Sequence, residues 1–230
     1  MKYKAVIFDL FGTLVYNFSR QEYENVLTEM AEILEVPRDN FIQHWFDSFK
    51  ERVTGELRMP YAMVENACRK LGKEVSIDRI EYAAQIRLNY SQKSMVPKPG
   101  ATEVLTQLRA EGYKTGLISD CSAETVITWD KTPFAPLFDV TVYSCVAGIK
   151  KPDPRIYHMA LDQLAVRPED CLYIGDGSSR ELTGAQEVGM HAVLIRDPDE
   201  SIDAHFVDRE EWNGTVISSL WEVLNLIEKG

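Results

Sequence analysis

The chain has 230 residues, of which 45% are hydrophobic and 27% charged, and its formal net charge is −11. This composition is ordinary for a globular protein with one large core, or with a core and a smaller second domain. The negative charge predicts that the chain does not bind nucleic acid, because a phosphate backbone would be repelled. No apolar run is long enough to span a bilayer, so no membrane partner is expected.

The cellular compartment is predicted from the cysteines and from the first residues. The four cysteines lack the spacing of a zinc site, a redox pair or a disulfide framework, which favours a reducing compartment. The start MKYKAVIFDL is interrupted by Asp9 and is typical of a first strand rather than of a signal peptide. We therefore expect a cytoplasmic protein, either a monomer or a homodimer.

After the first predicted strand (3–10), the sequence changes character. Four amphipathic segments follow, and each has apolar residues at helical spacing: 19–34, 39–53, 59–72 and 76–92. The stretch VPKPG (96–100) has the composition of a linker. We predict an all-helical cap domain at 16–94, inserted into an α/β core domain formed by 1–15 and 95–230.

The rest of the chain alternates between two patterns. Short apolar, β-branched runs predict strands buried on both faces of a parallel sheet; besides 3–10 they are 113–120, 138–145, 170–176 and 191–197. Helical patterns fall between most of them, at 101–112, 153–166 and 179–189. A short strand and a closing helix are expected within 212–230. The alternation predicts a doubly wound, Rossmann-like α/β fold.

Polar residues stand at the ends of three predicted strands. They are Asp9, the pair Ser119 and Asp120, and Asp176. The carboxyl ends of parallel strands form the ligand crevice of an open sheet. One such residue is easily a turn or a helix cap, but three together indicate a functional site.

Four short motifs occur in a fixed order: FDLFGTLV (8–15), LISD (117–120), GIKKPDP (148–154) and IGDGSSREL (174–182). In order and spacing they resemble the four motifs of the haloacid dehalogenase-like (HAD) hydrolases. The helical insert directly after the first motif is similar to the C1-type cap of that superfamily, and the phosphatase branch matches best. The resemblance covers nearly the whole chain.

The resemblance implies catalytic and substrate-binding roles. Asp9 would be the nucleophile that takes the phosphoryl group or attacks carbon. Thr13 and Ser119 would hold phosphoryl oxygens, with Asp120 beside the substrate. Lys151 would neutralise charge on the nucleophile and on the substrate, although the neighbouring Lys150 is an alternative.

The resemblance also implies a Mg²⁺ site. Asp9, Asp176 and the backbone carbonyl of Phe11 would bind the ion, and Glu181 would orient its water shell. Charge gives an independent reason, because carboxylates that converge on one crevice raise one another's pKa unless a cation relieves them. Glu181 is equally well explained as an acid in the first turn of a helix.

Two further groups have simpler explanations. Ser178 and Ser179 are better explained as N-caps of the following helix than as ligands. The insert carries Arg52, Arg58 and Lys70, which could meet a carboxylate or phosphate of the substrate. Residues of this kind more often solvate a helix.

Phe11 occupies the position where phosphatases of this superfamily usually have a second Asp, which protonates the leaving oxygen and then activates water. We expect a phosphatase of a small phosphorylated metabolite that uses another acid or accepts good leaving groups. A 2-haloacid dehalogenase is the alternative, because that branch has an aromatic residue at this position. A catalytically weak member that binds phosphate and Mg²⁺ is a third possibility, and phosphonate cleavage lacks a recognisable cap lysine.

Overall fold

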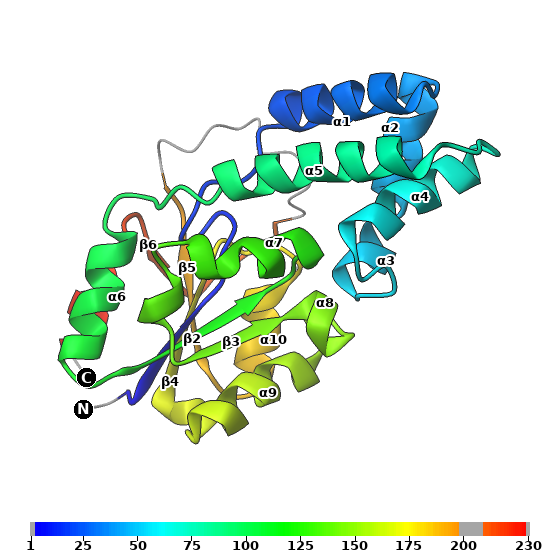
Figure 1. The fold of residues 1–230 in the computed structure, drawn as a ribbon. Helices are drawn as coiled ribbons and strands as arrows, with labels where there is room; N and C mark the ends of the chain where they lie inside the picture. Colours follow the sequence, from blue (N-terminus) through cyan, green and yellow to red (C-terminus); the bar gives the residue numbers. More distant parts are fainter. Residues whose placement is uncertain (1–2, 198–208, 229–230) are drawn as a thin grey trace.

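A computed structural model of the chain describes residues 3–197 and 209–228. Six strands form one parallel sheet in the order β3-β2-β1-β4-β5-β6 (Figure 1). They are β1 (Ala5–Phe8), β2 (Lys114–Ser119), β3 (Val140–Tyr143), β4 (Cys171–Gly175), β5 (His191–Ile195) and β6 (Thr215–Ile217). This is the strand order of a Rossmann-like sheet, so the predicted fold class is confirmed.

Helices cover both faces of the sheet. On one face lie α6 (Ala101–Ala110) and α11 (Glu222–Glu228), and on the other α9 (Pro154–Leu164) and α10 (Glu181–Glu187). Successive residues of a strand point to opposite faces, so Val6 packs in the first layer and Ile7 in the second. Residues buried on both faces explain why β1 and β4 are continuous apolar runs.

Five helices follow β1, where the sequence predicted four. We call them the helical layer: α1 (Arg20–Leu34), α2 (Arg38–Asp47), α3 (Phe49–Val53), α4 (Pro60–Lys70) and α5 (Ile77–Lys93). The expectation of one helix over 39–53 was wrong, because the chain breaks at Ser48, whose hydroxyl donates to the Trp45 carbonyl at 2.8 Å. The helical layer has its own hydrophobic cluster, which Ala123 joins from the α/β part.

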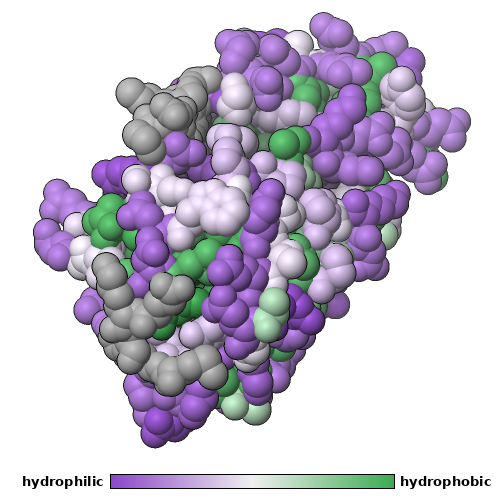
Figure 2. Space-filling view, turned by 90° about the vertical axis from the view of Figure 1, so that its left-hand side faces the viewer, coloured by the Kyte–Doolittle hydropathy of each residue, from purple (hydrophilic) through white to green (hydrophobic). Residues whose placement is uncertain are grey.

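Several short elements were not predicted. They are α7 (Ala123–Thr128), α8 (Ser144–Ala147) and three 3₁₀ turns, at Trp129–Lys131, Ala135–Leu137 and Pro168–Asp170. Elements of one or two turns carry too few residues to show a periodic pattern. Within the described ranges, no helix is both long and apolar enough to cross a membrane. The face shown in Figure 2 is mostly hydrophilic, as the net charge suggests.

The start of α10 differs from the prediction. Neither Ser178 nor Ser179 is its N-cap; that place is taken by Arg180, in the left-handed conformation and without a side-chain cap. The carboxylate of Glu210 accepts instead from Leu182 N at 2.7 Å and Thr183 N at 3.1 Å. A residue distant in sequence therefore caps this helix.

Removing this carboxylate should destabilise the fold. We expect Glu210→Ala to lower the free energy of unfolding by about 0.5–2 kcal/mol, because two amides of α10 lose their acceptor and the helix dipole loses an anion. Chemical denaturation measures the change. Glu211→Ala is the matched control, since Glu211 is exposed. An equal loss in both variants would contradict the capping role.

Candidate active site

The residues at the three strand ends come together, as predicted. Asp9 follows β1 and Asp176 follows β4, and these two strands are paired in the sheet. Ser119 ends β2, on the other side of β1. Carboxylate oxygens of Asp9, Asp176 and Glu181 all lie within 4.8 Å of one another, and all three residues are buried. The site therefore lies where the strand order reverses, which is the usual ligand position in such sheets.

Lys151 is the cation at the centre of this cluster. Its Nζ lies 2.5 Å from Asp9 Oδ1 and 2.5 Å from Glu181 Oε2, and the residue is 1% exposed. Burial opposes its charge, but Asp9, Glu181 and Asp120 outweigh burial and raise the Lys151 pKa, so the ammonium stays protonated. Lys150 points elsewhere, with its Nζ 3.7 Å from Asp120 Oδ2. Of the two lysines, Lys151 contacts Asp9.

The surroundings of Asp9 shift the pKa of its carboxyl group. Burial raises its pKa, the charge of Lys151 lowers it and the charge of Asp176 raises it, with a net rise to about 6. Asp176 is held in place by Ser178 N, which donates to its Oδ1 at 3.0 Å, and by Asn17 Nδ2, 3.2 Å from its Oδ2. Asp176 Oδ2 also lies 3.9 Å from Arg209 Nε, so an arginine contacts Asp176 while Lys151 contacts Asp9.

Glu181 is the first residue of α10, so it is an acid in the first turn of that helix, and it is also fully buried. Its Oε1 accepts from Gly177 N at 3.0 Å, and its Oε2 accepts from Tyr173 Oη at 2.9 Å as well as from Lys151. Burial and the charge of Asp9 raise its pKa, while Lys151 lowers it, with a net rise. Both oxygens are occupied by protein donors, so Glu181 holds Lys151 in position.

The remaining predicted residues lie around Asp9. Thr13 Oγ1 donates to Asp9 Oδ2 at 3.3 Å. Asp120 Oδ1 accepts from Lys151 N at 3.0 Å, whereas its buried Oδ2 has no hydrogen-bond partner in the described part of the chain. Ser119 Oγ is buried and likewise makes no hydrogen bond there that meets ordinary distance and angle criteria. Asp120 also lines a cavity above Asp9, whereas neither Thr13 nor Ser119 does.

Two residues, Gly12 and Lys98, determine the conformation of the loop after β1. Gly12 has φ +81°, and a Cβ there would lie 2.4 Å from Asp176 Oδ2, so only glycine fits. Lys98 Nζ donates to the Gly12 carbonyl at 2.6 Å and is buried. Sequence reasoning missed Lys98, because VPKPG indicated only a linker.

A cavity of about 340 Å³ opens over Asp9, Asp120 and Lys151. Its other walls come from the helical layer and the loop before it, from α7 and the segment after β2 that leads into it, and from the loop after β4. They carry Asn17, Phe18, Tyr23, Phe46, Phe49, Arg52, Val53, Arg87, Cys121, Ser122, Thr125, Ser178 and Ser179. Phe11 lines it too, with its ring centroid 4.9 Å from that of Phe18. This volume suits a small molecule.

The three basic residues singled out from the sequence are not equivalent. Arg52 lines the cavity and is buried. Arg58 is exposed and donates to the Gly55 carbonyl, and Lys70 is exposed and pairs with Glu51 at 3.5 Å. Neither lines the cavity. Arg87 does line the cavity, although no sequence motif had singled it out.

The donor set fits a hard divalent cation. Asp9 and Asp176 offer carboxylate oxygens close together, and oxygen is the ligand atom that Mg²⁺ prefers. Burial is the main cause of the raised pKa of Asp9, and the charge of Asp176 adds to it; a bound cation would offset that negative charge.

Comparison with known proteins gives the family. A model of the haloacid dehalogenase-like hydrolases matches residues 3–189. A glyceraldehyde 3-phosphate phosphatase of Pyrococcus furiosus is 32% identical over 135 residues, which are 57% of this chain and 54% of that protein. Acyl-CoA dehydrogenase family member 10 of Mus musculus is 26% identical over 208 residues, 87% of this chain and 18% of that protein. The matches thus cover about half, or less, of these relatives.

Solved structures with the same fold match nearly the full chain. A 2-haloacid dehalogenase from Pseudomonas syringae has a TM-score of 0.73 at 21% identity, and the match covers 99% of both chains. A HAD phosphatase from Thermococcus onnurineus has a TM-score of 0.68 at 21% identity, covering 97% of both. At this identity the likeness shows the fold alone. Because the family model covers most of the sequence, the chain belongs to the haloacid dehalogenase-like hydrolases.

Proposed function

We propose that the protein is a Mg²⁺-dependent phosphatase of a small phosphorylated metabolite, with Asp9 as its nucleophile. The observation that carries this proposal is the Asp9 carboxylate at the floor of a cavity, 2.5 Å from the buried Lys151 ammonium. Lys151 would offset the charge of both Asp9 and an incoming phosphate. The phosphatase names of relatives such as the Pyrococcus protein support the same choice.

In the proposed reaction, an oxygen of Asp9 attacks phosphorus and the bond from phosphorus to the leaving oxygen breaks. Water then attacks phosphorus, which releases inorganic phosphate and restores the Asp9 carboxylate. The hydroxyls of Thr13 and Ser119 would hold phosphoryl oxygens. Asp120, whose Oδ2 accepts no hydrogen bond from the described residues, would face the leaving group.

Asp9, Asp176 and the backbone carbonyl of Phe11 would hold the Mg²⁺. When bound, the ion would offset the charge of these carboxylates and of the phosphate. Glu181 would act on the ion indirectly and not as a direct ligand, because its carboxylate oxygens already accept hydrogen bonds from Lys151, Tyr173 and Gly177. The division into a cap domain at 16–94 and a core at 1–15 and 95–230 is part of the same proposal.

A 2-haloacid dehalogenase is the second candidate. Phe11 favours it, because an aromatic side chain lines the cavity where a phosphatase would place its general acid, and a departing halide needs no proton. The paired carboxylates of Asp9 and Asp176 weigh against it, since attack on carbon does not need a metal.

One assay separates these functions. We expect release of phosphate from an aryl or acyl phosphate in Mg²⁺, loss of release in excess chelator, and no halide release from 2-haloacids. Asp176→Asn should abolish turnover and weaken Mg²⁺ binding by calorimetry, because one of two carboxylate ligands is lost.

Asp162→Asn is the matched control, since Asp162 is exposed on α9, and it should behave as wild type. Full activity in chelator together with halide release would replace the phosphatase with the dehalogenase. Mg²⁺ binding without turnover of any substrate would identify a weakly catalytic binding protein.

A further inference from the structure

Arg52 is a buried cation without a counter-charge. It is 3% exposed and lines the cavity from α3. Its Nε donates to Ser48 Oγ at 3.3 Å and its Nη2 to the Trp45 carbonyl at 3.1 Å, and its guanidinium lies 4.7 Å from the centre of the Trp45 ring. No carboxylate within the described residues forms an ion pair with it. A buried charge without such a partner is costly, which suggests that a ligand completes the site.

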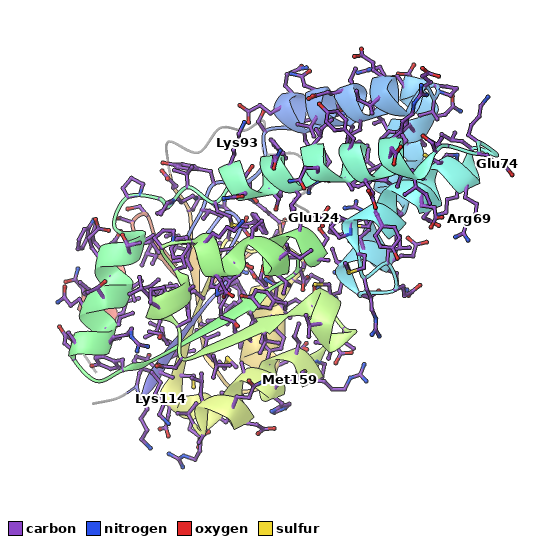
Figure 3. The ribbon with its side chains drawn as sticks, viewed as in Figure 1. Arg69, Glu74, Lys93, Lys114, Glu124 and Met159 are labelled. Carbon is purple, nitrogen blue, oxygen red and sulfur yellow. The ribbon has the colours of Figure 1, made fainter. Side chains whose placement is uncertain are left out.

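A second arginine lines the same cavity with incomplete hydrogen bonding. Arg87 is 3% exposed on α5, and its Nη2 lies 3.4 Å from Tyr23 Oη. Its Nε is 3.8 Å from Glu124 Oε1, too far for a hydrogen bond. Among the described residues, Arg87 Nε and Nη1 and both oxygens of Glu124 have no hydrogen-bond partner. Figure 3 shows Glu124 where α7 faces α5.

The positive charges of both arginines act on the hydroxyl of Tyr23. Burial opposes ionisation of its hydroxyl, but the charges of Arg87 and Arg52 outweigh burial and lower the Tyr23 pKa below its usual value. Arg52 and Arg87 line the cavity, whereas Glu124, which lies 3.8 Å from Arg87, does not, and the three charges together leave one positive charge in excess. That excess matches a monoanion, such as a carboxylate, better than a dianion.

We propose that Arg52, supported by Arg87 and the Tyr23 hydroxyl, binds a carboxylate on the leaving group of the substrate. The planar guanidinium is suited to a carboxylate. Phe11, Phe18 and Phe46 line the same cavity, so the body of the leaving group would be apolar. The substrate class would be phosphorylated apolar carboxylic acids. This assignment rests on the proposed phosphatase function.

A matched pair of substrates tests the proposal. The wild-type enzyme should have a kcat/KM for 4-carboxyphenyl phosphate about 10- to 100-fold above that for phenyl phosphate, the range of a hydrogen bond to a charged group. Arg52→Met should bring this ratio close to one. Arg58→Met is the matched control, because Arg58 lies in the same segment but outside the cavity, and should keep the wild-type ratio. If Arg52→Met does not fold, Arg52→Lys should still lower the ratio, since it lacks the planar fork.

Benzoate binding, followed by calorimetry, separates failure of this proposal from failure of the phosphatase function. Benzoate binding that Arg52→Met abolishes supports the carboxylate site even if neither phosphate ester is hydrolysed. Hydrolysis of both esters by the wild type at equal kcat/KM, without benzoate binding, overturns the proposal and leaves the phosphatase function standing. Binding of benzoate that is unchanged in Arg52→Met also overturns it.

Discussion

Asp9→Asn should lower kcat toward every substrate by about 10⁴-fold or more, because the amide cannot serve as the nucleophile. The same loss is expected whether the reaction attacks phosphorus or carbon, so the result tests the mechanism shared by both candidates. Phosphate release and halide release, measured side by side, give the two rates. A phosphoryl group on Asp9, detected by mass spectrometry after acid quench, should be present in the wild type and absent in the variant.

The structure predicts a side effect that needs a control. Asp9→Asn removes one of the two carboxylates that contact Lys151 and leaves Glu181 as the other. Thermal unfolding therefore has to show that the variant is folded. Asp162→Asn provides the activity control, since it makes the same chemical change at an exposed position. Turnover that survives in folded Asp9→Asn would remove Asp9 from the nucleophile's role.

The strands could be predicted because their signal is local. The run at 170–176 is mostly apolar, because β4 is buried on both faces of the sheet. The strand ends at Gly175, and the next residue, Asp176, belongs to the candidate site. The helices of the insert were located by period, but the break at Ser48 depends on a hydrogen bond to the Trp45 carbonyl that no periodic pattern shows. The number of helices was therefore wrong although their positions were close.

The residues of the candidate site also differ in whether a local sequence pattern identifies them. Asp9, Lys151 and Asp176 could be selected because each stands in a short motif at a strand end. Lys98 could not, because its role is defined by contact with the Gly12 carbonyl, 86 positions away. Arg87 follows a helical pattern that any solvated arginine would also satisfy, and only the fold brings it into the cavity.

Phe11 acquires a physical explanation from the cavity. Its ring lies against Phe18, which in turn lies 5.6 Å from Tyr23 and 5.6 Å from Tyr90, centre to centre. The position that would hold a general acid is thus part of an aromatic wall that continues into the helical layer. A carboxylate there would meet rings rather than hydrogen-bond donors, and that packing argues for substrates whose leaving group does not depend on a proton from this position.

Phe11→Asp should raise kcat/KM for alkyl phosphates, by at most the ~10²–10⁴-fold that general acid–base catalysis supplies. The wild type should cleave aryl and acyl phosphates far better than alkyl phosphates, because their leaving oxygens need little protonation. Phe11→Asp should reduce the ratio of the rate on aryl and acyl phosphates to the rate on alkyl phosphates. The gain will be reduced by the neighbouring carboxylates, which raise the pKa of an added one, and by the lost contact with Phe18. Rates on a matched series of aryl and alkyl phosphates measure the effect.

Phe11→Leu separates the carboxylate from the loss of the ring, because it removes the ring without adding an acid, and it should leave the gap between aryl and alkyl substrates open. The lifetime of the phosphorylated Asp9 gives a second measurement: it should be long in the wild type and shorter in Phe11→Asp, which gains a base to activate water.

Equal wild-type rates on aryl and alkyl phosphates would mean that another group donates the proton. Asp120 is then the residue to replace, because it lines the cavity and its Oδ2 has no hydrogen-bond partner among the described residues. A loss confined to alkyl substrates in Asp120→Asn would identify it as the acid, and an unchanged profile would direct the search to Tyr23 in the helical layer.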